Sequence, residues 1–157
     1  MDIQNFKDIV LINFVDNWRQ NICKMPKLCT YVLFKNEFCM ENYLMYVKSS
    51  KLRKLLSKLR LSSHDLFIEK GRYTNIPREQ RLCKFCNSGN IEDEKHFIID
   101  CTLYREEHSK LFSLLNIRII DENTFIKLMS LKQSEQLFIL CRFIQLCFKK
   151  RSVMYSL

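Results

Sequence analysis

Three cysteines and one histidine lie close together near the middle of the chain, with the spacing Cys-x2-Cys-x9-His-x4-Cys. Two cysteines separated by two residues can direct both thiolates at one ion. A histidine and a third cysteine complete four ligands, which close a tetrahedral site and leave no position for water. The spacing therefore predicts a structural Zn2+ site formed by Cys83, Cys86, His96 and Cys101, as a zinc knuckle on a short hairpin within residues 76–105.

The segment between the two ligand pairs contains turn-forming residues, NSGN at 87–90, which can fold the chain back on itself. Asp93 can then cap a short helix that presents His96. Five residues turn an ideal helix by about 140° beyond a full turn, so one continuous helix would direct Cys101 away from His96. We therefore expect the chain to break between these two residues, with Cys101 entering at a turn.

Two alternatives compete with the metal site. In the first, the four residues are merely buried in a core; in the second, Cys83 and Cys86 form a redox pair. No strand–helix pattern surrounds the two cysteines, which disfavours the redox alternative. The remaining cysteines lie among apolar residues and are expected in the core: Cys23, Cys29, Cys39, Cys141 and Cys147. His64 and His108 have no partner pattern and are expected at the surface.

The fold class follows from composition and periodicity. The 157 residues are 47% hydrophobic but include only two glycines and two prolines, so turn-rich all-β folds are disfavoured. Apolar residues recur at helical spacing in several segments. We expect one mainly α-helical domain over residues 1–157, with helical segments at 3–22, 51–61, 103–115, 124–130 and 134–150, and with a less periodic, aromatic-rich stretch at 29–47. Residues 61–81 are expected to form a loop with short extended pieces.

The positive charge is concentrated in one segment. The formal net charge is +9, and residues 51–84 carry +7 of it, whereas residues 1–50 and 85–157 carry +1 each. Such an excess favours an anionic partner, either nucleic acid or a membrane surface. The most apolar run, residues 137–148, is too short to span a bilayer and is interrupted by Arg142 and Gln145. The N-terminus lacks the pattern of a signal peptide. We therefore expect no membrane association and an intracellular location, nuclear or cytoplasmic rather than secreted.

Residues 51–61, KLRKLLSKLRL, form a basic amphipathic pattern, with four leucines on one face and cations on the rest. These cations and those near the cysteines can contact phosphates, while Tyr73 and Phe85 can stack on bases. The competing interpretations are that the helix cations form a solvated face and that Phe85 packs on the helix after His96. The predicted nucleic-acid contacts are Lys51, Arg53, Lys54, Lys58, Arg60, Arg72, Tyr73, Arg78, Arg81, Lys84 and Phe85.

Residues 50–113 resemble the C-terminal zinc-binding region of reverse transcriptases from LINE-type (non-LTR) retrotransposons. A leucine-rich basic stretch precedes SSH at 62–64, GRY at 71–73 and IPR at 76–78 lead to the Cys-x-x-Cys pair, and EDE-x-HF at 92–97 leads to the last cysteine. The resemblance implies that Cys83, Cys86, His96 and Cys101 bind zinc. It also implies that the region holds template RNA or target DNA.

The chain departs from that family in lacking its catalytic motifs. It contains neither a Tyr-x-Asp-Asp motif nor any adjacent Asp-Asp pair, which the polymerase would need, and no recognisable endonuclease cluster. We therefore expect a non-catalytic module that binds RNA or single-stranded DNA, with a reverse transcriptase acting in trans as a further candidate partner. A zinc-containing protein-interaction scaffold and a nonfunctional mobile-element remnant are the alternatives. Residues 134–150 are apolar on several faces, so they are expected to be buried or to bind a partner. The oligomeric state is left open.

Overall fold

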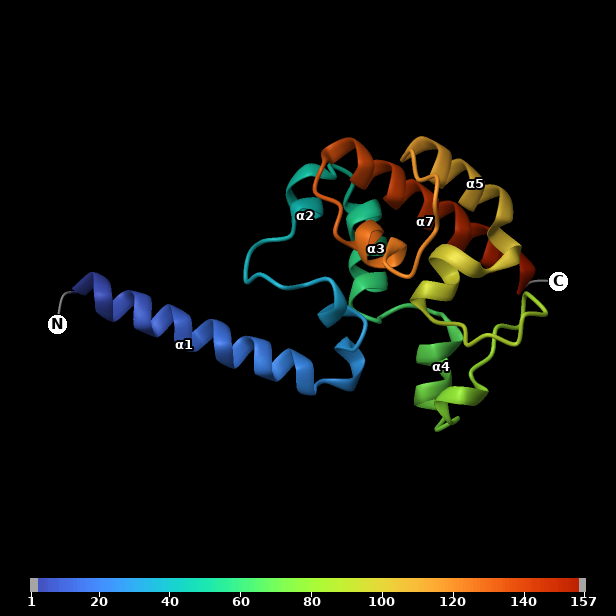
Figure 1. Ribbon diagram of the computed structural model, residues 1–157. Helices are drawn as coiled ribbons and strands as arrows, with labels where there is room; N and C mark the ends of the chain where they lie inside the picture. Colours follow the sequence, from blue (N-terminus) through green and yellow to red (C-terminus); the bar gives the residue numbers. More distant parts are fainter. Residues whose placement is uncertain (1–2, 156–157) are drawn as a thin grey trace.

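The computed structural model describes residues 3–155, which are mainly α-helical, as predicted (Figure 1). Short 3-10 and π turns connect the longer helices. The α-helices are α1 (Ile3–Lys24), α2 (Asn42–Tyr46), α3 (Ser50–Arg60), α4 (Phe67–Tyr73), α5 (Arg105–Leu114), α6 (Thr124–Met129) and α7 (Ser134–Met154). The shorter turns are η1 (Pro26–Leu28), η2 (Tyr31–Leu33), η3 (Arg78–Gln80), the π-helix η4 (His96–Asp100) and η5 (Thr102–Tyr104).

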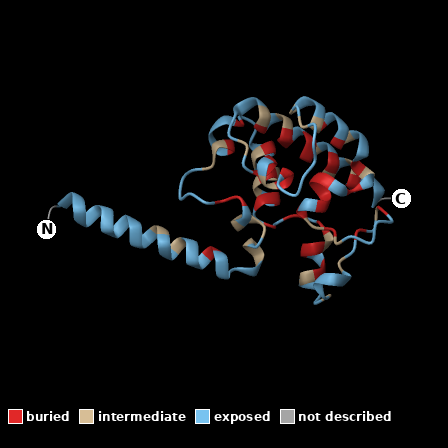
Figure 2. Ribbon diagram, viewed as in Figure 1, coloured by how far each residue is buried: buried red, intermediate tan, exposed pale blue. Residues whose placement is uncertain are grey.

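Helix α7 forms the centre of the core. Helices α2, α3 and α5 all pack on it, so apolar residues are needed on several of its faces (Figures 1 and 2). Leu140, Ile144 and Cys147 of α7 are fully or almost fully buried. The apolar character of residues 134–150 is thus explained by burial within the chain. Within residues 3–155, no helix is both long and apolar enough to cross a membrane.

Helix α3 has the amphipathic arrangement that its sequence predicts. Leu52, Leu56 and Leu59 are buried, and Leu55 packs against the same core. Ser49 caps the helix, since its Oγ accepts the backbone N–H of Leu52 at 3.4 Å. The packing of α3 on α7 therefore fixes which of its cations remain at the surface.

Helix α1 extends away from the rest of the molecule, and its length is almost entirely exposed (Figures 1 and 2). Of its described residues only Ile22 is buried. Phe14 and Trp18 contact the ring of Phe38 edge-on, with ring centroids 5.1 and 5.3 Å apart. The helix predicted at residues 3–22 is present, but it adds little to the core.

The aromatic-rich stretch at residues 29–47 forms η2 and the short α2, joined by an irregular segment in which Lys35 donates to the backbone oxygen of Cys39 and pairs with the carboxylate of Glu41. One local prediction is wrong. Residues 67–73 form helix α4 instead of a loop. The N–H of Phe67, at the start of α4, donates to Glu92 at 2.7 Å, an interaction between residues far apart in sequence.

The cysteines outside the metal motif divide into two groups. Cys141 and Cys147 are buried in α7, which confirms their expected place in the core. Cys23, Cys29 and Cys39 are exposed, so the core prediction is wrong for them. All three lie at the end of α1 or in the irregular stretch that follows, where apolar sequence does not coincide with burial.

Candidate metal centre

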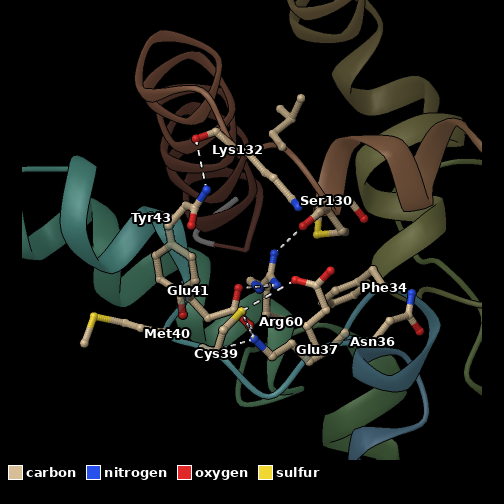
Figure 3. A pocket seen from close by; sticks show the side chains of 14 residues that line it. Phe34, Asn36, Glu37, Cys39, Met40, Glu41, Tyr43, Arg60, Ser130 and Lys132 are labelled. Atoms are coloured by element: carbon tan, nitrogen blue, oxygen red, sulfur yellow. Dashed lines mark hydrogen bonds and ion pairs between the residues drawn. The ribbon is translucent and has the colours of Figure 1, made fainter.

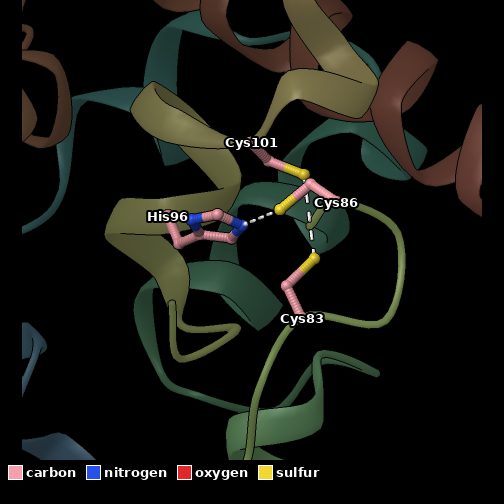
Figure 4. Close-up of side chains that lie close together, drawn as sticks. All are labelled: Cys83, Cys86, His96 and Cys101. Atoms are coloured by element: carbon pink, nitrogen blue, oxygen red, sulfur yellow. Dashed lines mark hydrogen bonds between the residues drawn. The ribbon is translucent and has the colours of Figure 1, made fainter. Parts of the chain in front are cut away.

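The four residues of the Cys-Cys-His-Cys motif come together at one buried site (Figure 4). Their ligand atoms, three Sγ atoms and one imidazole nitrogen, all lie within 4.8 Å of one another. Cys83 and Cys86 come from a hairpin, His96 from η4, and Cys101 from the residue that follows η4. These residues could hold one metal ion.

The hairpin is limited to one bridge. A single antiparallel bridge joins Leu82 and Ile91, and the N–H of Cys83 donates to the carbonyl of Asn90 at 2.9 Å. Gly89 supplies the reversal with a φ of 69°, in the left-handed region that glycine adopts without steric cost. This turn brings the two hairpin cysteines to face η4.

An α-helix from His96 to Cys101 would direct the two side chains apart, and the structure avoids this without the predicted break in the chain. The chain does not break after His96 but widens into the π-helix, where the N–H of Cys101 donates to the carbonyl of His96 at 2.8 Å. This i→i+5 bond makes a wider turn than an α-helix, which brings Cys101 back over His96. Cys101 itself is extended, so the helix ends at the ligand.

The distances between ligand atoms suit tetrahedral coordination. Zinc–sulfur bonds of about 2.3 Å at tetrahedral angles place two sulfur atoms about 3.8 Å apart. The Sγ atoms of Cys83 and Cys101 are 3.8 Å apart, and Cys86 Sγ lies 3.3 Å from His96 Nε2. The donor set and its spacing therefore fit a four-coordinate metal ion.

The ligands differ in how tightly they hold their protons. A hydrogen bond with Cys101 is the main cause that lowers the pKa of Cys83 to about 3, and the same bond, with burial, raises the pKa of Cys101. Burial lowers the pKa of His96, but its hydrogen bond and attraction to Cys83 outweigh this effect and raise it overall. Metal binding requires thiolates and a neutral imidazole, so it releases the remaining protons.

Three consecutive acids fasten the centre to the rest of the molecule. Glu92 forms a buried ion pair with Arg151 of α7, 2.9 Å from Nη2 to Oε2, and accepts the N–H of Phe67. Asp93 accepts the N–H of His96 through Oδ1 at 2.9 Å, which confirms its predicted role as a cap. Glu94 forms hydrogen bonds with Ser62 and His64, in the loop that follows α3. Sequence reasoning predicted the capping role of Asp93 but not the roles of Glu92 and Glu94. The signal that could have indicated them is the acidic run EDE at 92–94, which ends two residues before the ligand His96.

Both histidines outside the motif are buried, so their predicted surface location is wrong. His64 Nε2 lies 2.9 Å from Glu94 Oε1, which also accepts a hydrogen bond from Ser62 at 2.6 Å. These bonds tie the loop after α3 to the metal segment. His108 Nε2 lies 3.2 Å from the carbonyl of Phe97, and burial lowers its pKa. Both imidazoles serve packing and hydrogen bonding.

We predict that Asp93→Ala destabilises the protein by about 0.5–2 kcal/mol, because the N–H of His96 loses its cap. Metal affinity should fall by roughly tenfold or more, since Asp93 orients a ligand. Chemical denaturation and competition with a chromophoric chelator measure the two effects. Asp93→Asn keeps a side-chain oxygen at the same place and should retain most of both properties; equal losses in the two variants would contradict the capping role.

The predicted nucleic-acid residues fall into two groups. Six remain exposed: Lys51, Lys54, Lys58, Tyr73, Arg78 and Lys84. The others are partly or fully engaged within the protein. Arg53 donates to the carbonyls of Val47 and Lys48, and Arg72 pairs with Glu69 at 2.6 Å.

Two of the predicted contacts, Arg60 and Arg81, are used for internal structure, which argues against their predicted role. Arg60 is only 5% exposed, and its guanidinium binds Glu41 at 2.8 Å and lies 4.4 Å from the ring centre of Phe34 (Figure 3). Arg81 donates to two backbone carbonyls, those of Ile68 and Ile76. Local charge counting could not detect either arrangement, because each partner lies elsewhere in the sequence.

Phe85 packs on the end of α7 rather than on the helix after His96. Its ring meets Tyr155 edge-on at 4.9 Å, and the guanidinium of Arg151 lies 4.5 Å from its centre. Phe85 is half-buried by these contacts. The ring that was expected to stack on a base is therefore occupied within the protein.

Comparisons with family models, curated proteins and solved structures found no match to this chain.

Proposed function

We propose that this protein is a non-catalytic, zinc-stabilised module that binds RNA or single-stranded DNA. A set of three thiolates and one imidazole in a closed tetrahedral arrangement is the ligand set typical of structural zinc. No position is left for a substrate or an activated water, so the ion would serve stability. The resemblance to the zinc-binding region of LINE-type reverse transcriptases, which rests on the same ligands, points to nucleic acid.

One observation carries the proposal: exposed cations surround the centre. Arg78 is exposed and lies 3.7 Å from Asp93, the cap of the helix that presents His96. Lys84 is exposed between the two hairpin cysteines. Tyr73 is 73% exposed; the guanidinium of Arg72 lies 5.2 Å from its ring centre, and the exposed remainder of the ring can stack on a base. Phosphates could thus approach the metal-stabilised hairpin without competing for its ligands.

We predict that the metal-loaded protein binds short single strands with strong salt dependence. If four to six cations contact phosphates, log affinity should fall against log salt with a slope of about −3 to −4. Fluorescence anisotropy with labelled oligouridine and oligothymidine measures this slope. Arg78→Ala with Lys84→Ala should flatten it by about 1.4. Tyr73→Ala should weaken binding by about 1–3 kcal/mol at all salt concentrations, because stacking releases no counterions.

The matched control is Lys110→Ala with Arg118→Ala, which removes the same charge from two exposed positions outside this surface. It should leave the slope nearly unchanged. If the folded, metal-loaded protein binds neither RNA nor DNA at about 0.1 M salt, where contacts of this number give measurable affinity, the proposal fails.

A protein-interaction scaffold is the second candidate, and helix α1 favours it. Phe6, Leu11 and Ile12 are each more than half exposed on a helix of which only Ile22 is buried among the described residues. Exposed apolar side chains in such number are typical of interaction surfaces. Binding of nucleic acid by a protein that lacks α1 would show that the two functions are separate.

A further inference from the structure

We propose that a groove between α3 and α7 is the track for a single strand of nucleic acid, a specific form of the function proposed above. The groove is lined by Lys51 and Leu55 from α3 and by Arg142, Gln145, Leu146, Phe148 and Lys149 from α7. Its volume is about 540 Å3, within the range of roughly 300–1,000 Å3 typical of ligand-binding clefts. The lining residues of α3 and those of α7 are far apart in sequence, and the packing of the two helices brings them together.

The charge of the groove points to an anionic occupant. Lys51, Arg142 and Lys149 are exposed at its edges, and no acidic side chain is among the described residues that line it. Helix α3 contains five cations and no acid, and Glu135 is the single acid of α7. Other cations of the two helices form ion pairs, but within the part of the chain that the structure describes none of the ion pairs involves Lys51, Arg142 or Lys149.

On each of the two helices, the spacing of these cations places them on one face of the helix. Arg142 and Lys149 are seven residues apart, which places them within about 20° of each other around α7. On α3, Lys51 and Lys58 have the same spacing, and Lys54 lies within about 60° of both. The other cations near the end of α7 are not available, because Lys150 pairs with Glu107 and Arg151 with Glu92.

The floor of the groove favours a single strand over a duplex. Leu55 and Phe148 are half-buried, and Leu146 is 48% exposed, so apolar surface lies between the two rows of cations. Unpaired bases can cover apolar surface while their phosphates meet the flanking cations, which is the arrangement of single-strand-binding grooves. The bases of a duplex are stacked within the helix and cannot reach such a floor. An acidic peptide would lack the flat faces that suit it.

The test is binding of labelled oligouridine by Arg142→Ala with Lys149→Ala. Loss of two phosphate contacts should lower affinity by about 25-fold in about 0.1 M salt and flatten the salt slope by about 1.4. Leu146→Glu, which places a negative charge at an exposed position of the floor, should lower affinity by tenfold or more. The control pair Lys110→Ala with Arg118→Ala should change it less than twofold. Metal content and thermal melting confirm that each variant is folded.

The outcomes separate this inference from the proposed function. Wild-type binding that is lost in the groove variants and kept in the control supports both. If the groove variants bind as well as the wild type, the groove is not the nucleic-acid track. The broader nucleic-acid-binding function then stands and rests on the contacts of Arg78 and Lys84. Absence of wild-type binding to any single strand overturns both, and binding of the wild type, but not of the groove variants, to anionic vesicles or acidic peptides then identifies the other partner class.

Discussion

Removal of the metal is expected to unfold residues 81–104 and to lower the stability of the whole protein severely. Structural zinc contributes roughly 10–16 kcal/mol of apparent binding free energy in small zinc peptides. A typical domain is stable by only about 5–15 kcal/mol. Without the ion, three cysteines and a histidine remain buried, with their ligand atoms within 4.8 Å of one another.

The unfolding should be local first. Helices α3 and α5 pack directly on α7, so this core should persist in part after the metal has been removed. Elemental analysis should give one zinc per chain, and a strong chelator should abolish hydrogen-exchange protection in residues 81–104 while much of the far-UV helical signal remains. Loss of protection throughout the chain would show that the core depends entirely on the ion.

Cysteine variants provide the matched control. Cys83→Ser should abolish stoichiometric metal binding. Cys141→Ser changes an equally buried cysteine of α7 that lies outside the site, so it should retain one ion per chain. A purified protein without metal, together with an unchanged stability of Cys83→Ser, would falsify the metal centre.

Features of the fold that depend on residues close together in the sequence could be predicted, whereas features that depend on distant residues could not. The metal ligands could be predicted because their spacing is itself the signal, and α3 because its leucines and cations alternate with helical periodicity. The π-helix could not be predicted, because both a π-helix and a break in the chain would bring Cys101 back to His96, and the local sequence does not distinguish them. Helix α4 was missed because its start is capped by Glu92, from a later segment.

The cationic surface shows the same limit. Arg60 and Arg81 count as positive charge in the sequence, but their guanidinium groups bind partners within the fold. Arg142 and Lys149 do not stand out in a segment of nearly balanced charge, yet the packing of α3 on α7 places them beside Lys51. A local charge excess therefore predicts the kind of partner better than it predicts the residues that contact it.

The ion pair between Arg151 and Glu92 connects the metal segment to the core, and its disruption is expected to have the second largest effect. Both side chains are almost fully buried. Arg151 also donates to the carbonyl of Asp65 at 3.2 Å and to the hydroxyl of Tyr155 at 2.8 Å. Burial is the main cause that raises the pKa of Glu92, although the bond to Arg151 opposes it.

Arg151→Met should destabilise the protein by about 3–5 kcal/mol, because it leaves the carboxylate of Glu92 buried without its cation. Denaturant unfolding of the metal-loaded protein measures the loss. Glu92→Gln in the same background removes the unpaired charge and should restore a large part of it, since a buried ion pair is worth much less than the cost of breaking one half. Lys150→Ala is the matched control, because this neighbouring cation pairs with Glu107 at a partly exposed position and should contribute less than about 1 kcal/mol.

The dependence on pH gives a further check on the same variant. A carboxyl group whose pKa is higher in the folded than in the unfolded protein binds more protons when folded, so its protonation favours folding at low pH. Removal of Arg151 takes away the interaction that opposes the upward shift at Glu92. The deficit of Arg151→Met relative to wild type should therefore be largest near neutral pH and should shrink as the pH falls toward the ordinary range of a carboxyl group. A deficit that stays constant over that range would mean that Arg151 acts through packing on Phe85 and Tyr155 rather than through its charge.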